Sequence, residues 1–194
     1  MKAVRGAAVL AALAGLGCCA QAGWIHLKAQ LAQVLIGRAW ERREHGERDA
    51  RPWPWADTQP IAKLTLPGAP PRELFVLEGA SGRNLAFGPA HDPASVAPGE
   101  RGNSVIAGHR DTAFRALQSL HVGDRLQVER AGRRLWFEVR DVRIVDSRRT
   151  RLALSHGRPR VTLVTCYPFA SLDYGGPLRW VVTADLLDAP PRQP

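Results

Sequence analysis

The chain has 194 residues, a formal charge of +9 at neutral pH and 45% hydrophobic residues. Residues 57–194 carry 19 Lys and Arg against 14 Asp and Glu, spread over many segments and not interleaved with aromatic residues. This pattern argues against a nucleic-acid-binding surface, so nucleic acid is not an expected partner. A basic face towards anionic membrane lipid explains the excess charge better.

Residues 1–27 are predicted to form a signal anchor, that is, an uncleaved transmembrane segment. Lys2 and Arg5 form a short basic start, and residues 6–27 contain no charged side chain over 22 positions. A run of this length can cross a bilayer, with the basic end inside and the remainder of the chain outside the cytoplasm. A signal peptide cut after residues 20–22 is the alternative, but the apolar character continues past that cut.

Residues 28–57 are predicted to contain an amphipathic helix and then a linker. Apolar residues recur at helical spacing between basic ones, namely Leu27, Leu31, Val34, Leu35 and Trp40. Such a helix either leaves the membrane along its surface or packs on the following domain, and the sequence leaves both alternatives open. The prolines of residues 51–57, Arg-Pro-Trp-Pro-Trp-Ala-Asp, end the helix, so this segment is read as a linker that docks its tryptophans.

Residues 58–194 are predicted to form one mostly β domain, a closed barrel of seven to eight strands. The expected strands are Ile61–Leu66, Glu73–Leu77, Val105–Ala107, Arg125–Glu129, Leu135–Val145, Val161–Thr165 and Leu178–Ala184. They are separated by Gly, Pro, Asn and Asp, and only Asp111–Leu120 reads as a short helix. Many short strands with so little helix are typical of a barrel.

Cys166 ends the apolar strand that begins at Val161, and Pro168 stops this strand two residues later. The other cysteines, Cys18 and Cys19, lie in the predicted anchor. A domain with one thiol cannot form an internal disulfide, so outside the cytoplasm nucleophilic catalysis is the leading use of this thiol. A buried cysteine that acts as a small hydrophobe is the alternative.

A nucleophilic thiol needs a base or a cation nearby. His109 follows a small apolar strand and Gly108, which is how a barrel presents a catalytic group at its rim, whereas His91 lies in a predicted loop. Arg179 is the one cation in an apolar strand, thirteen residues after the thiol. A loop of this length can return the chain into an antiparallel neighbour and bring Arg179 next to Cys166. There the guanidinium could stabilise an oxyanion.

Two other chemistries find little support. The predicted domain has one cysteine, and no two histidines lie three to five residues apart, so no metal site is expected. No Gly-x-Ser-x-Gly sequence occurs that would indicate a serine nucleophile.

These residues resemble the sortase family of cysteine transpeptidases. Residues 103–112, Asn-Ser-Val-Ile-Ala-Gly-His-Arg-Asp-Thr, look like the family's histidine motif. Residues 162–166, Thr-Leu-Val-Thr-Cys, look like its cysteine motif, and Arg179 matches its arginine. Residues 87–91 and 98–103 resemble the loop before the histidine strand in class D- and E-like sortases.

Other segments resemble the proteobacterial, or class GN, type of sortase. They are residues 53–57, residues 165–169 and the Gly-Gly-Pro that precedes Arg179. This resemblance implies an inner-membrane enzyme with its barrel in the periplasm. It also implies a dedicated partner protein that carries a C-terminal sorting signal, and an amine acceptor that the sequence does not identify.

The resemblance also implies a mechanism without a cofactor. Cys166 attacks a carbonyl of the sorting signal and forms a thioacyl-enzyme, and His109 donates a proton to the leaving amine. Arg179 orients the substrate and stabilises the oxyanion, and the Thr165 hydroxyl assists. His91 is expected to support the substrate loop, without acting as the base.

Two further interpretations remain open. A thiol peptidase would resolve the same intermediate with water. A non-catalytic barrel would bind a partner peptide by strand addition, although it would not need cysteine, histidine and arginine together. The specificity loop is expected around residues 145–159, and its sequence does not reveal the sorting motif.

Overall fold

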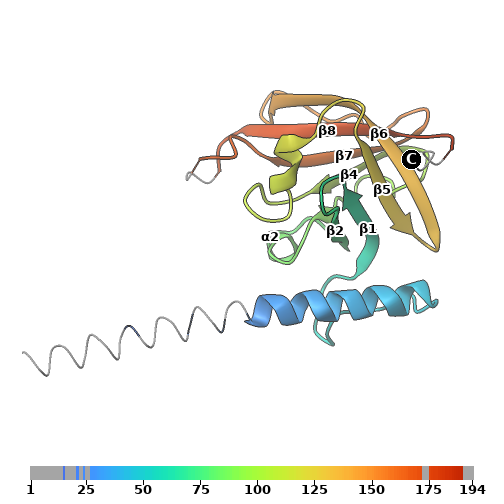
Figure 1. Cartoon of the computed structure of the whole chain (residues 1–194), viewed down its shortest axis with the longest axis vertical. Helices are drawn as coiled ribbons and strands as arrows, with labels where there is room; N and C mark the ends of the chain where they lie inside the picture. The colour runs from blue at the N-terminus through green and yellow to red at the C-terminus, as the bar shows by residue number, and fades with distance from the viewer. Residues whose placement is uncertain (1–14, 16–20, 22–23, 25–26, 172–174, 190–194) are drawn as a thin grey trace, which may run out of the picture.

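The computed structural model describes residues 15, 21, 24, 27–171 and 175–189. An N-terminal helix covers residues 27–44. The elements that follow are β1 (Pro60–Leu66), β2 (Arg72–Glu78), α2 (Gly82–Leu85), β3 (Ala90–His91), β4 (Gly102–Ala107), the 3₁₀ helix η1 (Arg115–Ser119), β5 (Arg125–Arg130), β6 (Arg133–Asp146), β7 (Pro159–Cys166) and β8 (Leu178–Leu186). In Figure 1 the helix lies as a separate layer below the barrel, on the side of β1 and β2.

The strands close into a barrel in the order β1-β2-β3-β4-β7-β8-β6-β5. The β2–β3 and β4–β7 pairs are parallel, and the other pairs are antiparallel. The period-2 alternation of β7 places Val161 and Leu163 in the core, where they meet Val182 and Ala184 of β8. The predicted mostly β, closed barrel is therefore confirmed, and the described residues form eight strands.

Two local predictions are wrong. His91 lies in the short strand β3 and not in a loop, because two residues are too few to give a recognisable alternation. The helix expected over Asp111–Leu120 is reduced to η1. Phe114, Leu117 and Leu120 are all buried at a spacing of three residues, with i to i+3 hydrogen bonds between them. This spacing suits a 3₁₀ turn and not an α-helix.

The N-terminal helix packs on the outside of the barrel. Ile36 is buried with Leu77 of β2, and the Trp40 ring lies 6.4 Å from the Phe75 ring, measured between centroids. The Gln33 side chain donates to the Phe87 carbonyl at 2.6 Å. Residues 27–44 therefore pack on the domain, which is one of the two arrangements that the sequence left open.

The two tryptophans of the linker behave differently. Trp53 packs edge-on against Phe87 at 5.2 Å between ring centroids, whereas Trp55 is 82% exposed. Among the described residues, no helix is long and apolar enough to span a bilayer. The anchor predicted over residues 1–27 falls almost entirely outside the described residues.

An ion pair joins the two strands that carry Cys166 and Arg179. The Arg160 guanidinium on β7 donates to both carboxylate oxygens of Asp185 on β8, at 2.7 and 3.2 Å. Hydrogen bonding and the positive charge of Arg160 lower the pKa of Asp185. A lowered folded-state pKa means that the pair stabilises the fold above the ordinary carboxyl pKa and that this contribution is lost as the pH falls below about 4.

We therefore expect Asp185→Asn to lower the melting temperature at pH 7 and to reduce the loss of stability on acidification. The reason is that the variant has no carboxylate to protonate at this position. Thermal denaturation from pH 7 to pH 3 measures both effects, with Asp188→Asn, at an exposed ion pair, as the control. Parallel pH profiles of Asp185→Asn and the unmodified protein would contradict the assignment.

Candidate active site

Cys166 and Arg179 are direct partners in the antiparallel ladder between β7 and β8. Directly opposed residues of such a ladder point to the same side of the sheet. Their neighbours Thr165 and Trp180 form the preceding pair and take the other side, towards the barrel interior. The thiol and the guanidinium therefore share the outer side of the barrel wall, at the end of β7, and both are partly exposed.

His109 is delivered to the same end of the sheet by β4, the other neighbour of β7. The parallel β4–β7 ladder runs to Ala107, and the Gly108 N–H continues it by donating to the Val164 carbonyl at 3.1 Å. The Thr165 hydroxyl donates to the Gly108 carbonyl at 2.7 Å. This hydrogen bond joins the residue before Cys166 to the residue before His109. The His109 side chain is exposed beside it.

Gly108 is required by a close approach of the core. A Cβ at this position would lie 2.7 Å from ring carbons of Phe114, which is fully buried. The Phe114 N–H also donates to the His109 carbonyl at 2.9 Å. Phe114 therefore fixes the turn that begins at His109, and a side chain at residue 108 would push the imidazole away from β7.

Arg110 is a positioning residue that the sequence analysis did not assign to the site. Its side chain is 9% exposed, and Nη2 donates to the Ser171 carbonyl at 2.7 Å. It joins the loop after β4, which carries His109, to the loop after β7, which follows Cys166. The sequence shows a basic residue directly after the candidate histidine. It does not show towards which loop that side chain points, because this depends on the fold.

An aromatic cluster packs against the core next to Cys166 and Arg179. Tyr167 stacks on Trp180 with 5.8 Å between ring centroids, and Phe169 packs edge-on against Trp180 at 5.6 Å. Trp180 Nε1 donates to the Leu117 carbonyl of η1 at 3.1 Å. These contacts hold the residues that directly follow Cys166 and Arg179. The sequence offered one hint of them, an aromatic residue beside each of these two residues.

The Arg179 guanidinium is partly committed to its own loop. Nη1 donates to the carbonyls of Gly176 and Leu178 at 2.5 and 2.9 Å. Among the described residues, Nε and Nη2 have no hydrogen-bond partner. One edge of the planar group is therefore anchored, and the other N–H groups can bind a substrate carbonyl or an oxyanion.

His91 is placed away from this arrangement. It lies on β3, which β4 separates from β7, and it is 6% exposed. Its Nε2 lies 2.9 Å from the Val96 carbonyl and 3.1 Å from the Ser95 hydroxyl. These contacts hold the turn after β3, so any effect of His91 on substrate would act through the turn that it supports.

A buried asparagine fixes the loop between β6 and β7, residues 147–158. The Asn103 side chain donates to the Ala153 carbonyl and accepts from the Thr162 hydroxyl, both at 2.8 Å. Its backbone N–H donates to the Leu154 carbonyl at 2.8 Å. This loop overlaps the expected specificity loop, and Asn103 holds it against β4 and β7, on the same outer side as Cys166.

We expect Asn103→Ala to loosen this loop. The change leaves the Ala153 carbonyl and the Thr162 hydroxyl without their partner, at a cost of about 1–3 kcal/mol. Hydrogen exchange should then accelerate at residues 147–158. The matched control is Asn84→Ala, which also removes a buried amide with two hydrogen-bond partners but lies in α2. Equal acceleration of loop exchange in both variants would contradict a specific role of Asn103.

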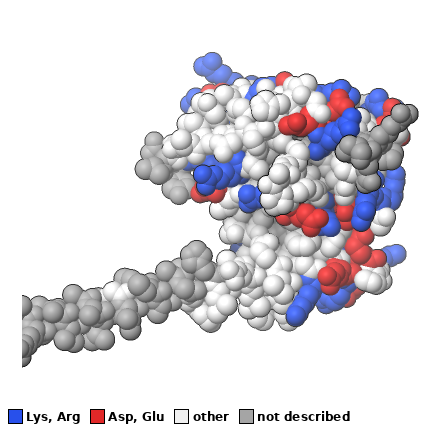
Figure 2. All heavy atoms as spheres, in the orientation of Figure 1, with Lys and Arg blue, Asp and Glu red and all other residues white. Residues whose placement is uncertain are grey.

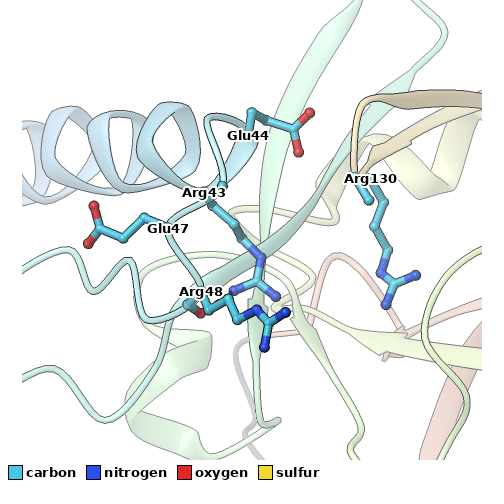
Figure 3. Close-up of a pocket in the computed structure, with 7 residues that line it drawn as sticks. Arg43, Glu44, Glu47, Arg48 and Arg130 are labelled. Carbon is cyan, nitrogen blue, oxygen red and sulfur yellow. Dashed lines mark hydrogen bonds between the residues drawn. The ribbon is translucent and has the colours of Figure 1, made fainter.

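A cavity of about 330 Å³ opens between the loops after β4 and β7. It is lined by Arg110, Asp111, Arg115, Gln118, Phe169 and Ala170. Another cavity, of about 560 Å³, lies between the end of the N-terminal helix and the β5–β6 turn (Figure 3). That second cavity is at the far end of β6 from Val145, the β6 residue opposite Arg179, and it takes no part in the site.

A thiol, an imidazole and a guanidinium thus come from β7, the turn after β4, and β8, at one end of a closed barrel. A closed barrel of this topology is the sortase fold. The sequence profile of the Sortase domain matches residues 64–187, and the chain belongs to the sortase family.

Known sortases are similar over different parts of the chain. Sortase D of Bacillus subtilis (strain 168) is 34% identical over 111 residues, which cover 57% of this chain and 56% of that protein. A Clostridium perfringens Sortase D5 transpeptidase structure has 25% identity and a TM-score of 0.57, covering 66% of this chain and 79% of its own. Sortase A from Corynebacterium diphtheriae, at 21% identity, supports the fold with a TM-score of 0.62, covering 84% and 86%.

Proposed function

We propose that this chain is a membrane-anchored transpeptidase that cleaves the C-terminal sorting signal of a dedicated partner protein. The observation that carries the proposal is the register pair of Cys166 with Arg179, beside a turn that presents His109. The similarity to proteins named Sortase D and Sortase D5 transpeptidase supports the same chemistry.

In the proposed reaction, the Cys166 thiolate attacks the scissile carbonyl, and the Nε and Nη2 groups of Arg179 stabilise the oxyanion. The C–N bond breaks as the His109 imidazolium gives its proton to the leaving amine. The thioacyl-enzyme is then attacked by an acceptor amine, whose proton passes to His109. Thr165 assists by holding the His109 turn through its hydrogen bond to the Gly108 carbonyl.

We further propose that the protein is of the proteobacterial type, with a single-pass anchor in the inner membrane and its barrel in the periplasm. The uncharged run of residues 6–27 after a basic start supports this topology. The motifs at residues 53–57 and 165–169 support the type.

Trapping the intermediate tests the proposed reaction. Hydroxylamine is a small amine that can replace the natural acceptor, so the protein incubated with an envelope extract should release a partner fragment that ends in a hydroxamate. Mass spectrometry of that fragment identifies the partner and the cleaved bond. Without any amine, a transpeptidase should accumulate the thioester. A peptidase would instead release the partner fragment as a free acid, at the same rate as with hydroxylamine present. Absence of both products would contradict the proposed function.

A further inference from the structure

The side of the N-terminal helix that faces away from the barrel is apolar over its first half. Trp24, Leu27, Leu31 and Val34 lie at helical spacing and are 52–57% exposed. The opposite side of the same helix carries the buried residues Ile36, Ala39 and Trp40. The helix is therefore apolar on two sides, and the contact with the barrel accounts for only one of them.

The linker extends this exposed apolar surface. Trp55, at 82% exposure, is the most exposed of the large hydrophobic residues that the structure describes. A cavity of about 490 Å³ lies between the helix and the linker and is lined by Leu31, Leu35, Trp53 and Trp55, among others. We call the surface formed by Trp24, Leu27, Leu31, Val34 and Trp55 the Trp55 face.

Positive charge borders the Trp55 face. The Lys28 ammonium lies 5.0 Å from the centre of the Trp24 ring and lines the cavity. Arg83 also lines the cavity but is paired with Asp57 at 3.1 Å, so Lys28 supplies the net positive charge. Farther along the helix the exposed residues become charged with both signs, namely Arg38, Glu41, Arg42 and Glu44. In Figure 2 this layer is mainly white where the helix begins and carries its charged spheres towards the other end. Tryptophan and lysine together are typical of the membrane interface, where a lysine extends its ammonium towards the headgroups.

The course of the chain indicates what covers the Trp55 face. The uncharged run of residues 6–27 ends at Leu27, which is itself part of the Trp55 face. The apolar stripe from Leu27 to Val34 is about 10 Å long at 1.5 Å per residue. A chain that leaves the bilayer at Leu27 necessarily brings this stripe to the lipid headgroups.

We propose that the Trp55 face lies in the headgroup region of a phospholipid bilayer and orients the catalytic barrel. This inference rests on the proposed anchor and adds a second, peripheral contact with the lipid. The helix packs on β2 and β3, and the barrel order places β6 and β8 across the barrel from them. The contact therefore turns the wall of β2 and β3 towards the membrane and the wall of β6 and β8 away from it.

Photo-crosslinking in the full-length chain tests the orientation. A benzophenone side chain is introduced as Trp55→p-benzoylphenylalanine, and Ile144→p-benzoylphenylalanine is the matched control. Ile144 is also a large exposed hydrophobic residue, at 45%, but it lies on β6. Both proteins are reconstituted into vesicles of phosphatidylethanolamine and phosphatidylglycerol and irradiated, and the adducts are identified by mass spectrometry. We expect phospholipid adducts at residue 55 and only background at residue 144.

The other outcomes overturn the proposal in recognisable ways. Adducts at residue 55 to a second copy of the chain would identify a dimer interface, and adducts to residues 1–26 would identify an intramolecular contact. Equal lipid adducts at both positions, or none at either, would exclude a fixed orientation. Vesicle flotation before irradiation separates the two levels of the argument. If the chain does not float, the proposed anchor is wrong. If it floats but forms no lipid adduct at residue 55, only the proposed contact of the Trp55 face with lipid is wrong.

Discussion

Cys166→Ala is expected to abolish formation of the hydroxamate product and of the thioester. The variant has no nucleophile at the end of β7, and no other thiol lies in residues 28–194. Cys166→Ser should be almost as damaging, because a hydroxyl is far less ionised than a thiol at neutral pH. The loss should occur without unfolding, since Cys166 is only partly buried and the core pairs of β7 and β8 are unchanged. Product analysis by mass spectrometry and circular dichroism of each variant provide the two measurements.

The two cysteines of the predicted anchor supply the matched control for this experiment. Cys18→Ala combined with Cys19→Ala should leave product formation unchanged, because both residues lie in the uncharged run and not in the barrel. A thiol reagent should inactivate this double variant by modifying Cys166. Product formed by Cys166→Ala at a rate near that of the unmodified protein would refute the cysteine mechanism.

The fold could be predicted because its strands carry a clear alternation. Leu163 and Val182 meet in the core, and the pattern that buries them also predicts the strands that contain them. The pairing of Cys166 with Arg179 was accessible for a related reason. The two residues are thirteen positions apart, and one glycine-rich break lies between them. A hairpin is the simplest connection between two strands at this separation. The structure pairs the two residues directly in the antiparallel ladder.

The remaining details of the site depend on contacts between distant segments. The Asn103 side chain binds the loop at residue 153, and the Arg110 side chain binds the loop at residue 171. Nothing in the sequence around Asn103 or Arg110 indicates which loop its side chain contacts. His91 illustrates the same limit, because β3 is strand only through its pairing with β2 and β4. The segment around the 3₁₀ helix η1 was misread as a longer helix because Leu117 and the flanking residues Phe114 and Leu120 are buried every three positions, close to the helical period.

Substitution of His109 and Arg179 is expected to separate the two roles assigned to them. His109→Ala removes the proton donor to the leaving amine, so acylation should fall by about two to four orders of magnitude. His121→Ala is the control for loss of an exposed histidine, and it should leave acylation unchanged. His91→Ala should lower the melting temperature, because His91 holds Val96 and Ser95, and it should affect acylation much less than His109→Ala.

Arg179→Lys is the most discriminating of these changes. The ammonium keeps the charge, but it cannot bind Gly176 and Leu178 with one nitrogen while presenting two other N–H donors in the same plane. We therefore expect Arg179→Lys to reduce acylation nearly as much as Arg179→Ala, with the barrel still folded by circular dichroism. Acylation rates with the sorting peptide identified by trapping provide the measurement for all five variants. If Arg179→Lys stays close to the unmodified protein, positive charge alone suffices, and the planar donor geometry assigned to Arg179 is wrong even if the family is right.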